Sequence, residues 1–215
     1  GNTPLMLAST NNHLEIVKIL IDNDVDLNLQ NSHKCTPLWS ASMHGHIDMV
    51  KLLLENGANP NIQIGEDKMT VLFSVAGKRF DENDIYVTTK RNLDSNDITL
   101  RVARVLLQNG ANPNILNIHE SNVLNLSARI GDIEMMKLLL DYGAKLDIQE
   151  NTGLTPLMAA SHANQLEACK LLIEYGANVN QTSSTQSATA LTYAIENNNI
   201  DIVKLLVKEG ADLSL

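Results

Sequence analysis

The stretch that decides the fold is residues 36–61, TPLWSASMHGHIDMVKLLLENGANPN. Thr36 and Pro37 signal the start of a helix, because a threonine hydroxyl caps free backbone N–H groups and proline loses nothing at the first helical position. Gly45 breaks this short helix, and a second, apolar helix follows. Gly57 suits the left-handed residue that ends a helix. The stretch therefore predicts two short helices joined by a tight turn.

The same pattern recurs along the chain. Gly-Ala pairs begin at residues 57, 110, 143, 176 and 210, with spacings of 53, 33, 33 and 34 residues. The residues that open the copies are Thr3, Thr36, Thr70, Asn122, Thr155 and Thr189. Asp24 replaces the glycine in the first copy, and aspartate tolerates left-handed backbone. The predicted units of this single domain are residues 1–33, 34–67, 68–119, 120–152, 153–186 and 187–215.

These motifs resemble the ankyrin repeat. The resemblance is carried by TPLMLAS, HLEIVKILI, the stretch of residues 36–61, GDIEMMKLLLDYGA, TPLMAAS and NIDIVKLLVKEGADL. It implies an all-α solenoid of six stacked helix-turn-helix units, with short β-hairpin fingers and a concave face. It also implies a protein that binds other proteins and has no catalytic residues of its own.

The chain departs from the family pattern at one position. Where the family motif Thr-Pro-Leu-His has histidine, the six copies have Met6, Trp39, Phe73, Asn125, Met158 and Thr192. We therefore expect the polar bond that this histidine makes between repeats to be absent. In addition, Leu7 and Leu205 in the first and last copies resemble interior residues, although a stack needs polar ends for solubility. We therefore expect the chain to be part of a longer protein.

Composition argues against several classes of protein. The formal net charge is −9, whereas a nucleic-acid module needs a basic face to neutralise phosphates. No segment has the roughly 18 apolar residues of a membrane-spanning helix. Cys35 and Cys169 lie far apart in the sequence, which favours a reducing, cytoplasmic compartment over a disulfide scaffold.

Charged residues recur on the second helices. The basic residues are Lys18, Lys51, Arg104, Lys137, Lys170 and Lys204, and the residues three positions earlier are Glu15, Asp48, Arg101, Glu134, Glu167 and Asp201. Five of the six sets predict i,i+3 ion pairs on a solvated face, each contributing ~0.2–0.5 kcal/mol. The third copy, with two arginines, is the exception.

Four residues invite a metal interpretation, namely His33, Cys35, His44 and His46. Zinc needs three or four such ligands in tight geometry. Here His46 occupies the family's Gly-His position, and we expect His33 and Cys35 to lie in a finger, away from the second helix. The sequence therefore predicts no metal and no cofactor. No catalytic constellation has the required context, so we expect no enzymatic activity.

Asn28 carries a second hypothesis. In some organisms, ankyrin repeats resembling this one are hydroxylated on the finger asparagine, and Leu20 with Asp26-Leu27-Asn28 matches the spacing of that context. The alternative is that Asn28 caps the turn.

The resemblance also indicates which surface binds a partner. In ankyrin stacks the finger tips and the exposed end of each first helix line the concave side. The residues predicted to bind the partner protein or peptide are His33, Met43, His44, Met69, Lys78, His119, Arg129, Ile130, Leu154 and His162. Apolar residues at exposed positions are typical of a protein contact surface. The alternative is that they pack under neighbouring fingers.

The third copy carries an insertion at about residues 79–97, between helices expected at residues 70–78 and 99–108. We expect Phe80 or Tyr86 in this segment to anchor a partner, because inserted loops in solenoids often lie on a binding face. The alternative is a disordered loop.

The predicted function is a non-catalytic protein–protein interaction module, a scaffold or adaptor. One alternative is the substrate-targeting module of a larger enzyme, such as a ubiquitin ligase component or a secreted bacterial effector. Another is the cytoplasmic domain of a membrane protein. The sequence specifies neither the partner nor the oligomeric state.

Overall fold

A computed structural model describes residues 1–78 and 93–214, with residues 78 and 93–97 described by their backbone alone. The chain divides into two compact units, Gly1–Ile118 (unit 1) and His119–Leu215 (unit 2). The division falls beside the predicted boundary between the third and fourth repeats. Most of the predicted insertion, with Phe80 and Tyr86, lies outside the described residues.

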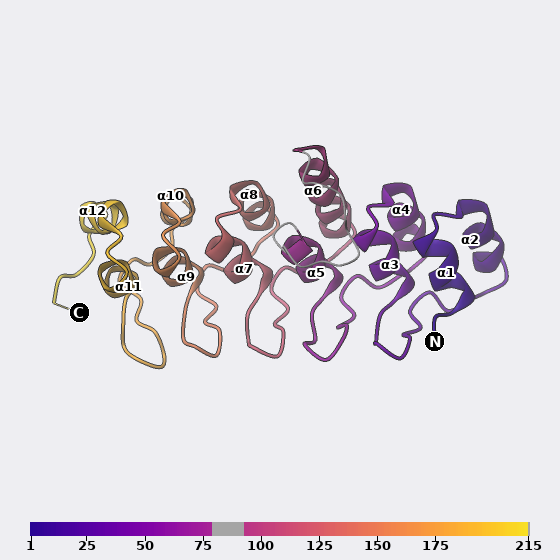
Figure 1. The fold of residues 1–215 in the computed structure, drawn as a ribbon, viewed down its shortest axis with the longest axis horizontal. Coiled ribbons are helices and arrows are strands. Elements are labelled where there is room, and N and C mark those ends of the chain that lie inside the picture. Colours follow the sequence, from indigo (N-terminus) through magenta and orange to yellow (C-terminus); the bar gives the residue numbers. More distant parts are fainter. Residues whose placement is uncertain (79–92, 215) are drawn as a thin grey trace. The chain divides into compact units, whose positions relative to one another are not determined.

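Each unit is built from helix pairs. In unit 1 the helices are α1 (Pro4–Thr10), α2 (Leu14–Ile21), α3 (Pro37–Met43), α4 (Ile47–Glu55), α5 (Val71–Lys78) and α6 (Leu93–Gln108). In unit 2 they are α7 (Val123–Ile130), α8 (Ile133–Asp141), α9 (Pro156–His162), α10 (Leu166–Glu174), α11 (Ala190–Glu196) and α12 (Ile200–Lys208). Within each unit the first helices of the pairs form one layer and the second helices another, and loops project from the first layer as fingers (Figure 1).

The first helix of every pair begins where the sequence predicts. The side-chain oxygens of Thr3, Thr36, Thr70, Asn122, Thr155 and Thr189 each accept a hydrogen bond from the backbone N–H three residues on, at 2.9–3.4 Å. Substituting such a cap by alanine costs about 1 kcal/mol. Asp24 has φ +57°, which confirms that it replaces the left-handed glycine that ends the other second helices.

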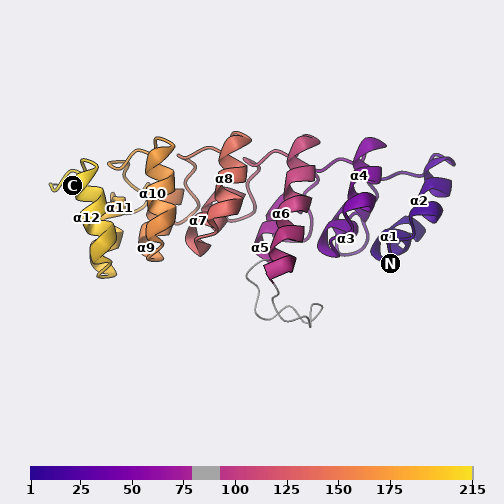
Figure 2. The same ribbon diagram turned by 90° about the horizontal axis from the view of Figure 1, so that it is seen from above.

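Two local predictions differ from the structure. Helix α6 begins at Leu93 rather than Thr99, and it extends beyond α2 and α4 in Figure 2. Of the five expected i,i+3 ion pairs, four form, at 2.6–3.3 Å. The fifth, Asp48 with Lys51, is not made within the described structure, and Asp48 instead lines a hollow with Arg101.

The fingers are simpler than the predicted β-hairpins. Among the described residues, β-type pairing is limited to one isolated bridge, between Ile64 and Met69, where both backbone hydrogen bonds form. In the α8–α9 finger, residues 146–155, Glu150 N–H donates to the Leu154 carbonyl at 3.1 Å, and the reciprocal bond is missing. Several finger carbonyls accept hydrogen bonds from side chains, as described below.

The core is formed where helix pairs stack. Met49 on α4 is fully buried, as are its counterparts Met135 and Ala168 on the second helices of unit 2. Ile16, at the same position of α2, keeps 49% of its surface exposed, because no described helix pair precedes α1 and α2. The same residue position is therefore core or surface according to whether a neighbouring pair covers it.

This difference predicts different mutational costs at one repeat position. Met49→Ala should lower the free energy of unfolding by about 2–5 kcal/mol, because it empties a fully buried site. Ile16→Ala should cost about 1 kcal/mol or less, since half of the side chain is already in water and alanine favours helix. Urea denaturation followed by circular dichroism measures both values. Equal losses would contradict the assignment of Ile16 to an open face.

Candidate protein-binding surface

In unit 1 the predicted binding residues lie at the end of a first helix and in the fingers. Met43 and His44 close α3, Met43 half-buried and His44 exposed. His33 is exposed in the finger before α3, and Met69 is half-buried in the finger before α5. Lys78 ends α5, and its side chain lies outside the described structure.

Two histidines of unit 1, His44 and His46, bond to backbone carbonyls. His46 Nε2 lies 3.0 Å from the carbonyl oxygen of Thr10, which joins the second helix pair to the first. His44 Nδ1 lies 2.8 Å from the Ser40 carbonyl, and the two imidazole rings stack with centroids 5.7 Å apart. Within residues 1–78 and 93–214, His, Cys, Asp and Glu form no group of three that could hold a metal ion.

The same bond recurs in unit 2 with other side chains. Gln165 Nε2 donates to the Arg129 carbonyl at 3.4 Å, and Asn199 Nδ2 donates to the Ser161 carbonyl at 2.7 Å. Both occupy the position of His46, directly before the second helix. In these three helix pairs the residue at this position thus bonds one pair to the preceding pair, with a different polar side chain as the donor in each.

Asparagines join successive pairs on the finger side. Asn61 Nδ2 donates to the Gly110 carbonyl at 2.9 Å, while its Oδ1 accepts from the Asn112 N–H at 2.8 Å. Asn28 makes the equivalent bonds to Gly57, at 3.5 Å, and Asn59, at 2.8 Å. Asn28 is therefore a bridge to the next helix pair, and its hydroxylation stays a prediction.

Glutamines join successive fingers nearer the finger tips. Gln30 Nε2 donates both to the Lys34 carbonyl of its own finger, at 2.7 Å, and to the Gln63 carbonyl of the next, at 2.9 Å. Gln63 repeats this arrangement with the carbonyls of Lys68 and Leu116. These bonds are not among the sequence predictions, although Gln30 and Gln63 lie 33 positions apart, which is the repeat length.

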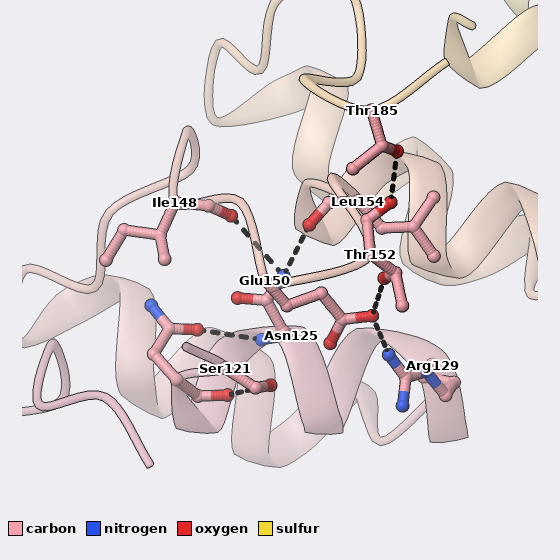
Figure 3. Close-up of polar contacts among 9 residues, drawn as sticks. Ser121, Asn125, Arg129, Ile148, Glu150, Thr152, Leu154 and Thr185 are labelled. Carbon is pink, nitrogen blue, oxygen red and sulfur yellow. Dashed lines mark hydrogen bonds and ion pairs between the residues drawn. The ribbon is translucent and has the colours of Figure 1, made fainter. Parts of the chain in front are cut away.

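In unit 2 the strongest polar cluster joins α7 to the α8–α9 finger. The Arg129 guanidinium forms an ion pair with Glu150, using Nη2 and Oε1 (Figure 3). The Thr152 hydroxyl donates to the same carboxylate oxygen at 2.9 Å. The Glu150 side chain is only 7% exposed, whereas that of Arg129 is 46% exposed. A buried carboxylate is thus neutralised by a half-exposed arginine.

Asn125 on α7 also binds the α8–α9 finger, contrary to one expectation from the sequence. Its Nδ2 donates to the carbonyls of Ile148, at 3.4 Å, and Leu154, at 3.2 Å, on the two arms of the finger (Figure 3). The expectation that no polar bond is made from the position of the family histidine is therefore wrong for this copy. Asparagine is short, but the finger backbone lies close enough for its amide to reach both carbonyls.

The other predicted residues of unit 2 are accessible. Ile130 and Leu154 are half-buried, while His119 and His162 are exposed. His162 contacts Tyr193 edge-on, with ring centroids 6.0 Å apart. The backbone of His119 accepts a 3.0 Å hydrogen bond from Asn151 N–H of the α8–α9 finger. None of the described predicted binding residues belongs to the buried core.

Comparison with known proteins agrees with this architecture. A family model described as ankyrin repeats (3 copies) matches residues 1–64, 95–183 and 124–215. The chain therefore belongs to the ankyrin repeat family. No curated protein matches the chain. None of the described helices is long and apolar enough to cross a membrane.

Three solved structures show the same fold. An ankyrin repeat domain from Acinetobacter baumannii AYE is 22% identical, with a TM-score of 0.81, over 97% of this chain and 98% of that one. The ankyrin repeat domain of Bcl-3, a member of the IkappaB protein family, is 26% identical, with a TM-score of 0.84, over 100% and 89%. The human ASB11 ankyrin repeat domain is 26% identical, with a TM-score of 0.71, over 100% and 86%.

We call the two hydrogen bonds from Asn125 Nδ2 to the Ile148 and Leu154 carbonyls the clamp. The clamp should contribute measurably to stability. Asn125→Ala should lower the free energy of unfolding by about 1–2 kcal/mol, because two finger carbonyls lose their donor. We expect a loss at the low end of this range, because Asn125 Oδ1 is buried and accepts no hydrogen bond in the described structure. Removing the side chain also removes the cost of burying that oxygen. Asn151→Ala, an exposed asparagine of the same finger, is the control. An unchanged urea midpoint for Asn125→Ala would contradict the clamp.

The two cysteines should differ in reactivity. Burial raises the pKa of Cys169 to about 11, and Cys169 is fully buried beside the Ser161 hydroxyl. Burial also raises the pKa of Cys35, but this thiol is only half-buried. Because the thiolate is the reactive form, iodoacetamide at pH 8 should modify Cys35 first. Mass spectrometry of the labelled peptides measures both rates, and labelling of Cys169 as fast as Cys35 would show that the α9–α10 pair opens readily.

Proposed function

We propose that this chain is a non-catalytic scaffold or adaptor module that binds a partner protein or peptide through its fingers and the ends of its first helices. Ankyrin repeat domains are generally protein–protein interaction modules, which supports the class of function. The observation that carries the proposal for this chain is the accessibility of Met43, Ile130 and Leu154, which are apolar and only half-buried. Apolar side chains among charged ones are typical of protein contact surfaces.

The framework beneath these residues supports the proposal. The fingers are held by side-chain hydrogen bonds to neighbouring fingers, such as those of Gln63 in unit 1 and Gln149 in unit 2. Asn125 and Glu150 tie the α8–α9 finger to α7 as well. A surface that is ordered before binding loses less conformational entropy when a partner docks. The hydrogen bonds that order the fingers therefore support the proposal that a partner docks on them.

Charged substitutions test this surface. Met43→Glu, and Ile130→Glu combined with Leu154→Glu, should each reduce capture of the partner at least about tenfold, because apolar anchors dominate interface energy. The measurement is affinity capture from lysate with quantitative mass spectrometry, followed by titration of the captured protein. Circular dichroism should remain unchanged, since none of the three is a core residue.

Tyr142→Glu is the matched control, because Tyr142 is exposed at the end of the second helix α8, away from the fingers. It should leave capture unchanged. If the variants at Met43, Ile130 and Leu154 unfold, these residues belong to the core. The alternative that they pack under neighbouring fingers is then correct. If the variants fold and still capture the same protein, the proposed surface is wrong.

A further inference from the structure

Arg129 is held differently from the second-helix lysines that form ion pairs. Four second-helix lysines pair with exposed carboxylates, as Lys137 does with Glu134 at 3.2 Å. Arg129 instead pairs with Glu150, whose side chain is almost fully buried and is also bonded by the Thr152 hydroxyl (Figure 3). A buried carboxylate needs its counter-charge, because an unpaired charge away from water is costly. The pairing therefore fixes the position of the guanidinium.

Both the backbone and the side chain of Arg129 are bound by neighbouring groups. Its carbonyl accepts a hydrogen bond from Gln165, and its guanidinium is bound by the finger. The finger is in turn fixed by Asn125 and by Thr185, whose hydroxyl donates to the Thr152 carbonyl at 2.7 Å. An arginine loses much rotamer entropy when it binds a ligand. For Arg129 that ordering has already occurred during folding.

The guanidinium keeps binding capacity after this pairing. It has five N–H donors, and in the described structure Glu150 is the acceptor found for it, through Nη2. Nearly half of the Arg129 side chain is exposed. The remaining donors suit a second carboxylate, which guanidinium groups bind with two parallel hydrogen bonds.

The surroundings define what kind of segment carries that carboxylate. Ile130 follows Arg129 directly, and Leu154 follows Thr152 by two residues; both are half-buried apolar side chains. At the position of Arg129, the next first helices have His162 and then Glu196, both exposed. With a net charge of −9 on the whole chain, a strongly acidic partner is repelled. One acidic residue next to apolar ones fits this surface better.

We propose that Arg129 is a specificity-determining anchor that binds one aspartate or glutamate of a partner segment, whose neighbouring apolar side chain packs on Ile130 and Leu154. Glu150 is the positioning residue for Arg129. This inference rests on the proposed function, because it names the chemistry of the partner at the same surface.

A library of short random peptides displayed on phage, selected against the whole chain, tests the inference. The selected peptides should share an aspartate or glutamate beside an apolar residue. Replacing that acid by its amide should weaken binding on the order of tenfold, as expected for a charge-assisted hydrogen bond lost at an interface. Arg129→Gln should weaken binding to a similar extent, and the two changes together should cost little more than either alone.

Two further variants separate binding from folding. Arg129→Gln leaves Glu150 without its counter-charge, so the double variant Arg129→Gln with Glu150→Gln, which removes both charges, is measured beside it. Urea denaturation monitors the stability of both. The double variant should fold and still bind the peptides about tenfold more weakly. Arg104→Gln, the same change at an exposed arginine of α6, should leave binding unchanged.

The outcomes distinguish this inference from the proposed function. Peptides that bind the double variant and the wild type equally, but lose affinity with Leu154→Glu, would overturn the role of Arg129 and leave the proposed surface intact. Peptides whose affinity responds to neither Leu154→Glu nor Met43→Glu would overturn the proposed function as well. A selection that yields no binding peptide contradicts both.

Discussion

The structure depends on one constraint, namely that a pair of short helices cannot bury its own apolar faces. Met49 and Ala168 are fully buried because the preceding helix pair covers them, while Ile16 at the same position remains half-exposed. Each pair is therefore stable only as a neighbour of another, as expected for a repeat architecture. The polar side chains that bond neighbouring helix pairs to each other therefore also contribute to folding.

Those polar side chains act in two places. On the helix side, His46, Gln165 and Asn199 each reach back to a carbonyl near the end of the preceding first helix. On the finger side, Asn61 and its counterparts bridge forward to the next pair. Because a hydrogen bond forms only within a narrow range of distance and angle, these bonds contribute to the spacing of neighbouring helix pairs.

The sequence was sufficient for the parts of the fold that depend on local chemistry. The opening threonines, the helix-breaking residues and the left-handed Asp24 each follow from the properties of one residue and its immediate neighbours. The start of α6 at Leu93 did not follow, since the predicted start assumed a helix of normal repeat length. The regular repeat thus set the expectation, and the structure departs from it next to the inserted segment.

The site was less predictable, because its contacts join residues far apart in the chain. Positions such as Arg129, Leu154 and His162 could be placed on the accessible surface from the repeat register alone. The bonds of Asn125 to the carbonyls of Ile148 and Leu154 could not, since they connect residues 23 and 29 positions apart and depend on how closely the finger approaches α7. The family histidine suggested only that a polar bond was lost at this position.

Hydrogen bonds to backbone carbonyls allow the surface side chains to differ from one helix pair to the next. Most of the bonds between neighbouring pairs end on backbone groups, as those of His46, Asn61 and Gln63 do. A backbone carbonyl is present whatever side chain the residue carries, so the residue at the acceptor position is free to change without loss of the bond. The eighth position of the first-helix motif shows this freedom, since it is Thr10, Met43, Arg129, His162 or Glu196 in different pairs. Thr10 and Arg129 both accept the bond from the following pair through their carbonyls, although one side chain is a small hydroxyl and the other a guanidinium. The side chains at this position can therefore be selected for binding while the main chain beneath them maintains the stack.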